Sequence, residues 1–379
     1  MIIQDIKVVP VGKYLFVKIY TDNGIVGLGE AGAWGFLEAT IGAINKFKKY
    51  LIGKNPMHIE HHWQYMYRSL YFRGSIVMSA ISAIDIALWD IKGKYLGVPV
   101  YELLGGKCRS KVRTYVPIFE FDAESMAQGC ADAKKQGYTA ARLIIPTIQN
   151  GNGNIDDETF GGKIEIAVEK IKKCREAVGS KFDLCVEVHR SMTVSESITF
   201  ARRIEKYNPY FIEDPIAPDS IDAMVEVAKK TKVPIATGER AISIQEFEML
   251  LSRRGAQYAR PDVCAVGGLT ASKKIASIAE SHYVGIIPHN PLGPVSTAAC
   301  LQLDASIPNF AIQEYPSFNY NGEEDSMTKE PLQVENGYII IPNAPGIGVE
   351  LVDDVSKKFP PLQRDLAVKI AMDGSVMDR

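Results

Sequence analysis

The pattern of apolar and polar residues divides the chain into three parts. Residues 1–111 begin with stretches in which apolar and polar side chains alternate, then show apolar residues at three- and four-residue spacing. These patterns predict a β-meander followed by helices. Residues 112–320 repeat a short apolar run and a helical segment, whereas residues 321–379 lose this alternation. The hairpin-like sequence at 337–342 predicts that the last part returns to the N-terminal domain.

Eight short apolar runs in the middle part predict eight strands. Helical segments separate these runs, which favours parallel strands joined by crossover helices. Eight such units over about 210 residues indicate a closed parallel barrel. An open doubly wound sheet is the alternative, but no Gly-x-Gly-x-x-Gly turn follows the first strand. The predicted strands span 112–117, 140–145, 183–189, 209–213, 233–239, 258–263, 284–288 and 311–314.

Three glutamates stand where three successive runs end. Glu187, Glu213 and Glu239 are 26 residues apart each time, the length of one strand, one helix and two loops. In a parallel barrel such residues meet at one end, and three carboxylates repel one another unless a cation joins them. Because an all-oxygen ligand set suits a hard ion, the pattern predicts a Mg²⁺ site. Three separate surface glutamates are the alternative.

A histidine and an aspartate follow on later strands. His289 comes directly after an apolar run, and Asp262 on the preceding predicted strand is its candidate orienting partner. A neutral histidine suits proton abstraction near pH 7, so we expect His289 to act as a base. Alternatively, His289 is a structural residue that caps the proline-rich turn at 288–291.

A second histidine lies beside the predicted metal ligands. His189 follows Glu187 by two residues, which places both on one face if the strand continues. His189 is then positioned to protonate a leaving hydroxyl group or to act as a second base, with a hydrogen-bonded structural histidine as the alternative. Arg142 and Glu314 stand at two further strand ends.

These residue types together indicate chemistry on a carboxylic acid. A divalent ion held by three carboxylates keeps coordination positions open for a substrate carboxylate, which the ion polarises. Removing a proton from the adjacent carbon makes an enediolate with two negative oxygens, and the metal stabilises this charge.

Loops outside the strand ends are candidates for covering the site. Residues 30–35 are glycine-rich and include Trp34, which predicts a mobile flap; an ordinary loop with Trp34 packed on its own domain is the alternative. Arg73 lies in the loop at 71–74. We expect these two side chains to contact the substrate and, together with the polar loop at 149–162, to determine specificity.

The composition argues against some classes of partner and indicates where in the cell the protein is found. The chain has 379 residues, 46% of them hydrophobic and 23% charged, with a net charge of −2. These values are typical of a globular protein, and no basic run indicates a nucleic acid or membrane partner. The six cysteines are scattered without a Cys-x-x-Cys pair, which favours reduced thiols. No signal peptide or membrane span is apparent, so we expect a cytoplasmic protein.

The chain resembles the mandelate racemase subgroup of the enolase superfamily over nearly its whole length. The resemblance implies an α+β capping domain over a (β/α)₇β barrel, with domains at 1–111, 112–320 and 321–379. It implies Mg²⁺ on the three glutamates, a His289–Asp262 dyad as base, His189 as acid, Glu314 in contact with the substrate, and a homo-oligomer. The matching segments are the three strand-end glutamates, residues 260–262, Gly267-Gly268, residues 288–294, residues 71–74 and residues 83–94.

The sequence departs from this family pattern at three places. Glu187 stands where aspartate is more usual, so the ligand reaches one methylene further. His189 is followed directly by Arg190, where the dehydratases have His-Gly-Arg. Arg142-Leu143-Ile144 replaces the Lys-x-Lys base of many relatives, and arginine stays protonated with a pKa above about 12. These changes disfavour a lysine-based racemase.

Three functions follow from this resemblance. The first is a lyase that dehydrates a small-molecule sugar acid, an aldonate, by removing the α-proton and the 3-hydroxyl to give a 2-keto-3-deoxy product. The second is a racemase or epimerase of an α-hydroxy acid that uses His189 and His289 as two bases. The third is a non-catalytic sugar-acid-binding relative, which would have no need of a base.

Overall fold

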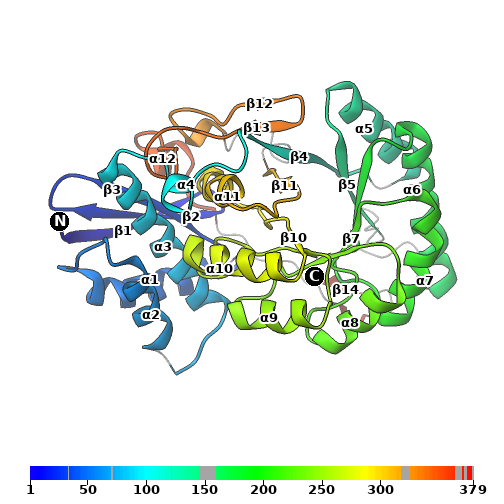
Figure 1. Ribbon diagram of the computed structural model, residues 1–379, viewed down its shortest axis with the longest axis horizontal. Coiled ribbons are helices and arrows are strands. Elements are labelled where there is room, and N and C mark those ends of the chain that lie inside the picture. Colours follow the sequence, from blue (N-terminus) through cyan, green and yellow to red (C-terminus); the bar gives the residue numbers. More distant parts are fainter. Residues whose placement is uncertain are drawn as a thin grey trace.

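In the computed structural model, two parts of the protein lie side by side: a smaller N-terminal part and a barrel (Figure 1). We call the N-terminal part, residues 1–111, the capping domain. None of the described helices is long and apolar enough to cross a membrane. The structure describes residues 1–32, 34–69, 71–120, 122–145, 159–316, 325–362, 369–370 and 374–377.

The capping domain consists of an antiparallel three-stranded sheet and helices packed on it. Gly24, with φ of 83°, makes the turn between the second and third strands. The sheet order is β1-β2-β3, with strands β1 (Ile3–Val11), β2 (Tyr14–Thr21) and β3 (Val26–Ala31). The helices are α1 (Leu37–Leu51), α2 (Ile59–Arg68), α3 (Ser75–Leu96) and α4 (Val100–Leu103).

Eight parallel strands form the barrel. Each pairs with its sequence neighbour from β4 to β10, and β11 pairs in parallel with β4. Between β10 and β11, Ile286 N–H donates to Asn309 O at 2.8 Å and Ala311 N–H donates to Ile286 O at 2.9 Å, which closes the ring. The strands are β4 (Lys111–Ile118), β5 (Ala140–Ile144), β6 (Asp183–Glu187), β7 (Phe211–Glu213), β8 (Ile235–Thr237), β9 (Tyr258–Ala259), β10 (Gly285–Ile286) and β11 (Gln313–Glu314).

One helix follows each of the first seven barrel strands, which confirms the predicted (β/α)₇β fold with a capping domain. The sequence signals for these helices include side-chain N-caps at Asp122, Thr159, Thr193, Ser220 and Ser243. The helices are α5 (Ala123–Lys135), α6 (Phe160–Val178), α7 (Val194–Ile204), α8 (Ile221–Lys230), α9 (Ile244–Ser252), α10 (Gly268–Ser281) and α11 (Pro294–Ser306), with a short η1 (Glu205–Tyr207) after α7.

The last strands are shorter than the sequence predicts. The run at 258–263 gives only the two-residue β9, and the run at 284–288 gives only β10. Asp262 and His289 continue the pairing as an isolated parallel bridge beyond these strands. The chain leaves the sheet where its residues turn toward the carboxyl end of the barrel. Each apolar run is therefore longer than the hydrogen-bonded strand that it contains.

The strand that ends at Glu187 also stops early. His189 and Arg190 have φ of 53° and 63°, so a left-handed turn follows β6 directly. The prediction that strand alternation places His189 on the face of Glu187 is therefore wrong, because residues with positive φ leave the pleat.

The C-terminal part contacts both domains. Its hairpin, β12 (Val334–Glu335) and β13 (Tyr338–Ile340), pairs β13 antiparallel with β4 of the barrel. The hairpin packs on the barrel because β4 offers it an edge at residues 111–113. Later residues do reach the capping domain, where Gly346 O accepts a hydrogen bond from Val100 N–H at 2.9 Å.

Short elements complete the described C-terminal part: η3 (Asp325–Met327), α12 (Val355–Lys358), β14 (Lys369–Ile370) and β15 (Val376–Met377). Apolar side chains fill the barrel interior and pack its helices onto the strands. Five cysteines are buried, Cys108 is exposed, and all six are free thiols.

Candidate functional site

The three glutamates predicted as metal ligands meet at the carboxyl ends of neighbouring strands. Glu187 ends β6 and lies opposite Glu213, which ends β7. Glu239 follows β8 after Gly238, whose φ of 129° turns the chain. One oxygen of each carboxylate lies within 4.8 Å of those of the other two. The alternative of three separate surface glutamates is excluded, because Glu187 is 2% exposed and Glu213 is fully buried.

The negative charge of the three carboxylates favours binding of a cation between them. Burial, and then repulsion from Glu213, raise the pKa of Glu187 well above its usual range. Neither carboxylate oxygen of Glu213 accepts a hydrogen bond from the described residues, although Arg260 Nη2 lies 2.8 Å from Oε1. Buried carboxylates without donors are costly unless a positive ion joins them. The all-oxygen triad can therefore hold a hard divalent metal ion.

A buried arginine network lies beside the triad. Arg142 Nη1 is 2.9 Å from Glu314 Oε1 and 3.6 Å from oxygens of both Glu187 and Glu213. Arg260 Nη2 is 2.8 Å from Glu213 Oε1 and 2.8 Å from Glu314 Oε2. Although burial opposes ionisation, Arg142 and Arg260 lower the pKa of Glu314 to about 2. Glu314 thus stays charged at the edge of the site.

His289 and Asp262 form the predicted pair. His289 Nδ1 lies 2.9 Å from Asp262 Oδ2, and His289 Nε2 lies 3.4 Å from Glu239 Oε2. Although burial opposes the charge, Glu239 and Asp262 raise the pKa of His289 to about 9. With Nδ1 engaged by Asp262, Nε2 is the ring nitrogen that faces the triad and can exchange a proton there.

The left-handed turn after β6 places the backbone of His189 against the triad. Its backbone N–H donates to Glu187 Oε1 at 2.5 Å, and its Nε2 lies 2.9 Å from Arg190 Nη2. Arg190 Nη1 also pairs with Asp214 Oδ2 at 3.1 Å and contacts Glu239. The turn thus fixes His189 through its backbone and through the neighbouring guanidinium group.

The structure separates the two residues predicted in the covering loops. Trp34 is half-buried against the core, and the neighbouring Gly32 N–H donates to Cys264 O at 3.0 Å, close to Asp262. Arg73 lies on the exposed surface, where Nη1 donates to Tyr67 Oη at 2.9 Å. Of the third loop, residues 146–158 lie outside the described residues.

Sequence reasoning missed three residues of this site. Arg260 and Arg190 entered only through the comparison with the family pattern, and Asp214 received no predicted role. In the structure, Asp214 accepts a hydrogen bond from Thr237 Oγ1 at 2.6 Å. Arg260 and Asp214 follow apolar runs in the same way as Arg142 and Glu187. A rule that collects every charged residue within two positions of a strand end would have found both.

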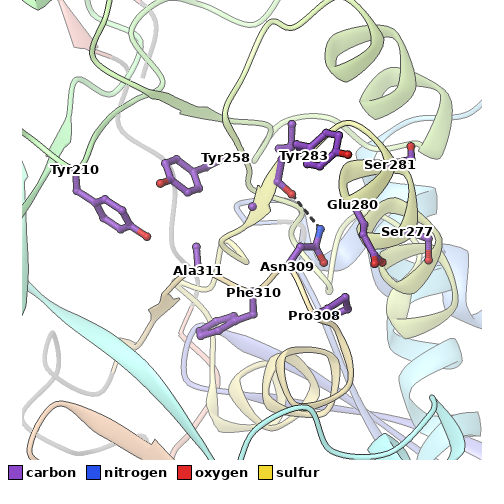
Figure 2. A pocket seen from close by; sticks show the side chains of 12 residues that line it. Tyr210, Tyr258, Ser277, Glu280, Ser281, Tyr283, Pro308, Asn309, Phe310 and Ala311 are labelled. Atoms are coloured by element: carbon purple, nitrogen blue, oxygen red, sulfur yellow. Dashed lines mark hydrogen bonds between the residues drawn. The ribbon is translucent and has the colours of Figure 1, made fainter.

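The opposite end of the barrel has a different character. A pocket of about 940 Å³ lies there, and Figure 2 shows Tyr210 and Tyr258 on one side of it and Asn309 on the other. These residues precede or begin β7, β9 and β11. Because barrel enzymes place their chemistry at the carboxyl ends of the strands, this pocket is not the candidate active site.

Comparison with known families fits both parts of the structure. Residues 5–105 match the model of the mandelate racemase / muconate lactonizing enzyme N-terminal domain, and residues 125–355 match the enolase C-terminal domain-like model. The chain belongs to the enolase superfamily, mandelate racemase subgroup.

Individual relatives match over almost the whole chain. The D-galactonate dehydratase of Xanthomonas oryzae pv. oryzae is 36% identical, covering 91% of each chain. A member of the enolase superfamily from Salmonella Typhimurium has a TM-score of 0.88 at 32% identity, covering 94% of this chain and 98% of its own. An enolase from Agrobacterium radiobacter, solved with bound Na and L-malate, has a TM-score of 0.92 at 27% identity, covering 99% of both chains.

Proposed function

We propose that this protein is a Mg²⁺-dependent dehydratase that converts an aldonate resembling D-galactonate into a 2-keto-3-deoxy sugar acid. Superfamily membership and its dehydratase relatives make the chain a hydro-lyase acting on a sugar acid. The observation that supports the reaction most directly is the contact between dyad and triad. His289 Nε2 lies 3.4 Å from Glu239, one of the three candidate ligands.

Glu187, Glu213 and Glu239 would hold Mg²⁺, since one oxygen from each converges with the others and both oxygens of the buried Glu213 lack a hydrogen-bond donor among the described residues. When bound, the ion supplies a Lewis acid that polarises the substrate carboxylate and stabilises negative charge on its oxygens. Arg142 would contact the same carboxylate end of the substrate. Its guanidinium pairs with Glu314 and lies beside Glu187 and Glu213, two of the candidate metal ligands.

Proton transfer is assigned to the two histidines. Glu239 is the main group that raises the pKa of His289, and a cation held by the triad would offset its charge and leave the imidazole neutral. His289 Nε2 then takes the α-proton, while Asp262 holds Nδ1 and stabilises the imidazolium that results. The C3–O bond then breaks, and His189 delivers a proton to the departing hydroxyl, which leaves as water. The enol that remains takes up a proton at C3 and releases its C2 hydroxyl proton, which gives the 2-keto-3-deoxy acid. Proton exchange with solvent returns His289 to its neutral form and His189 to its protonated form, so atoms and charges balance.

One observation favours a second candidate, an epimerase that uses the two histidines as opposing bases. The backbone N–H of His189 bonds Glu187 Oε1 and His289 Nε2 lies 3.4 Å from Glu239, so two histidines adjoin the triad. Such an enzyme would exchange the α-hydrogen with solvent and invert the carbon without losing water.

Incubation with a panel of sugar acids, D-galactonate first, in D₂O with Mg²⁺ tests both candidates. We expect a 2-keto acid to form with one member of the panel and turnover to stop with chelator. Exchange and inversion of the α-carbon without any 2-keto acid would reject dehydration in favour of epimerisation. If no sugar acid undergoes either reaction, both assignments fail.

A further inference from the structure

A buried glutamate of the capping domain contacts the loop that carries His289. Glu30, near the end of β3, is fully buried, and each of its carboxylate oxygens accepts one backbone hydrogen bond from the barrel. Gly293 N–H donates to Oε1 at 2.7 Å, and Ser296 N–H donates to Oε2 at 2.7 Å. Both donors belong to the start of α11, a few residues after His289.

The sequence of β3 aims Glu30 at this helix. A Cβ atom at Gly27 would lie 2.2 Å from Ala87 O, and one at Gly29 would lie 2.0 Å from Ala83 O. The two glycines therefore let β3 rest directly on the backbone of α3. Because side chains alternate along a strand, Glu30 points away from α3 and toward α11. Figure 1 shows α10 and α11 on the side of the barrel that faces the capping domain.

The same strand end also holds the partner of His289. Gly32 N–H donates to Cys264 O at 3.0 Å, and Cys264 N–H donates to Asp262 Oδ1 at 2.8 Å. The other oxygen of Asp262 binds His289 Nδ1 at 2.9 Å. Both members of the dyad are thus connected, through short hydrogen-bond paths, to Glu30 and Gly32 of the capping domain.

The path from Glu30 to His289 runs through Ser296 and Asn290. While Ser296 N–H binds Glu30, its Oγ donates to Asn290 Oδ1 at 2.7 Å. Asn290 directly follows His289, and its own N–H donates to Glu314 Oε2 at 3.0 Å. The side chains of Glu30, Ser296, Asn290 and Glu314 are all buried. In such a closely packed region, a shift of α11 at Ser296 is transmitted to the backbone beside the imidazole.

We propose that Glu30 is a positioning residue for proton transfer, which holds the start of α11 so that His289 keeps its place between Asp262 and the triad. This inference rests on the proposed function, in which His289 moves the α-proton. Glu30 touches neither the substrate nor the metal ligands, so its loss should slow proton transfer without removing a metal ligand. A displacement of about 1 Å in a reacting group is enough to cost up to about 100-fold in rate.

The test compares Glu30→Gln with a matched control, Asp90→Asn. Glutamine keeps the length of the side chain but offers one acceptor oxygen, and its NH₂ group faces the second N–H donor. Asp90 is equally buried, and its oxygens accept from Leu28 N–H and Ile347 N–H, both at 2.9 Å. Asp90 Oδ2 also lies 2.7 Å from Lys94 Nζ, so the control loses the same kind of backbone bond and an ion pair besides, at a place without contact to the dyad.

Two readouts separate positioning from loss of stability. The first is turnover of the sugar acid that the wild type dehydrates, measured as kcat and KM at saturating Mg²⁺. The second needs no substrate: selective ¹⁵N labelling of the six histidines, with the His289 signals assigned by their loss in His289→Asn. We expect Glu30→Gln to lower kcat at least about tenfold, with KM and Mg²⁺ affinity within about twofold. Its His289 signals should shift.

Asp90→Asn should melt at a lower temperature yet leave kcat and the His289 signals unchanged. The inference is overturned if the two variants have the same kcat, or if the His289 signals of Glu30→Gln match those of the wild type. Should Glu30→Gln not fold, Gly32→Ala replaces it, because a Cβ there would lie 3.0 Å from Cys264 O and press on the Asp262 side. A wild type without sugar-acid turnover refutes the proposed function alone, since the histidine signals still report the contact.

Discussion

The two halves of the site are held in place by different parts of the molecule. Glu187 and Glu213 are paired in the ladder of β6 and β7, and Val188 N–H donates to Glu213 O at 3.1 Å beyond it. His289 and Asp262 lie past the ends of two-residue strands and depend on contacts with the capping domain. The proposed metal half is therefore held by the barrel, whereas the proposed proton-transfer half contacts both domains.

This difference indicates that metal binding and proton transfer can be disrupted separately. The triad should bind metal whenever the barrel is folded, because the register of β6 and β7 and the turn at Gly238 after β8 bring its carboxylates together within the barrel. The dyad should respond to changes at the domain interface. The predictions below test this separation, beginning with the change that affects both halves.

Replacing Glu213 by glutamine should abolish activity and weaken Mg²⁺ binding by at least about 100-fold. The change removes one of three charges from a small, buried hard-ion site while keeping its volume. Calorimetric titration with Mg²⁺ and the dehydration assay measure the two effects. Full activity of this variant in the presence of chelator would refute the assignment of the triad.

Replacing His289 by asparagine should reduce turnover and α-hydrogen exchange by about 10³-fold or more, because the base is lost. Mg²⁺ affinity should stay within about threefold of the wild type, since His289 is not one of the three converging carboxylates. Asp262→Asn should show a weaker form of the same defect, as the imidazole loses its orienting partner. A large fall in metal affinity in either variant would contradict the separation of the two halves.

Replacing His189 by asparagine should slow dehydration by about 10²-fold yet preserve some α-hydrogen exchange. Hydroxide is a poor leaving group and needs an acid, whereas the base and the metal ligands remain in this variant. Exchange in D₂O followed by NMR distinguishes the two steps. If His189→Asn abolishes exchange while His289→Asn keeps it, the roles of the histidines are reversed.

The contrast between the halves also explains what the sequence could predict. The apolar runs that end at Glu187, Glu213 and Glu239, with their equal spacing, contain the barrel register, so the triad follows from local pattern alone. The crossover helices are equally local, since one follows each of the first seven barrel strands, as the alternation of apolar runs and helical segments predicts.

What could not be predicted depends on distant residues. The left-handed turn at His189 is stabilised by Arg190, which contacts Asp214 on the next strand. The contact of Glu30 with Gly293 joins residues 263 positions apart in the chain, and no periodicity in one sequence reports it. The position of Arg73 could not be predicted either. Its guanidinium stacks 4.1 Å from the centre of the Tyr67 ring, a contact that depends on how the loop packs.

The smallest expected effect concerns Trp34, at the point where the capping domain approaches the dyad. Its loop begins at Gly32, which is bonded to Cys264, and its side chain is only half-buried. We predict that this segment moves over the bound ligand and excludes water, which strengthens the electrostatic interactions in the site. A competitive inhibitor with Mg²⁺ should then change Trp34 fluorescence and lower the protease sensitivity of the loop. Trp34→Phe supplies the control, because it removes this signal and leaves those of Trp63 and Trp89. Inhibitor binding that changes neither fluorescence nor cleavage would show that the capping domain contacts the dyad as a fixed support, without a moving flap.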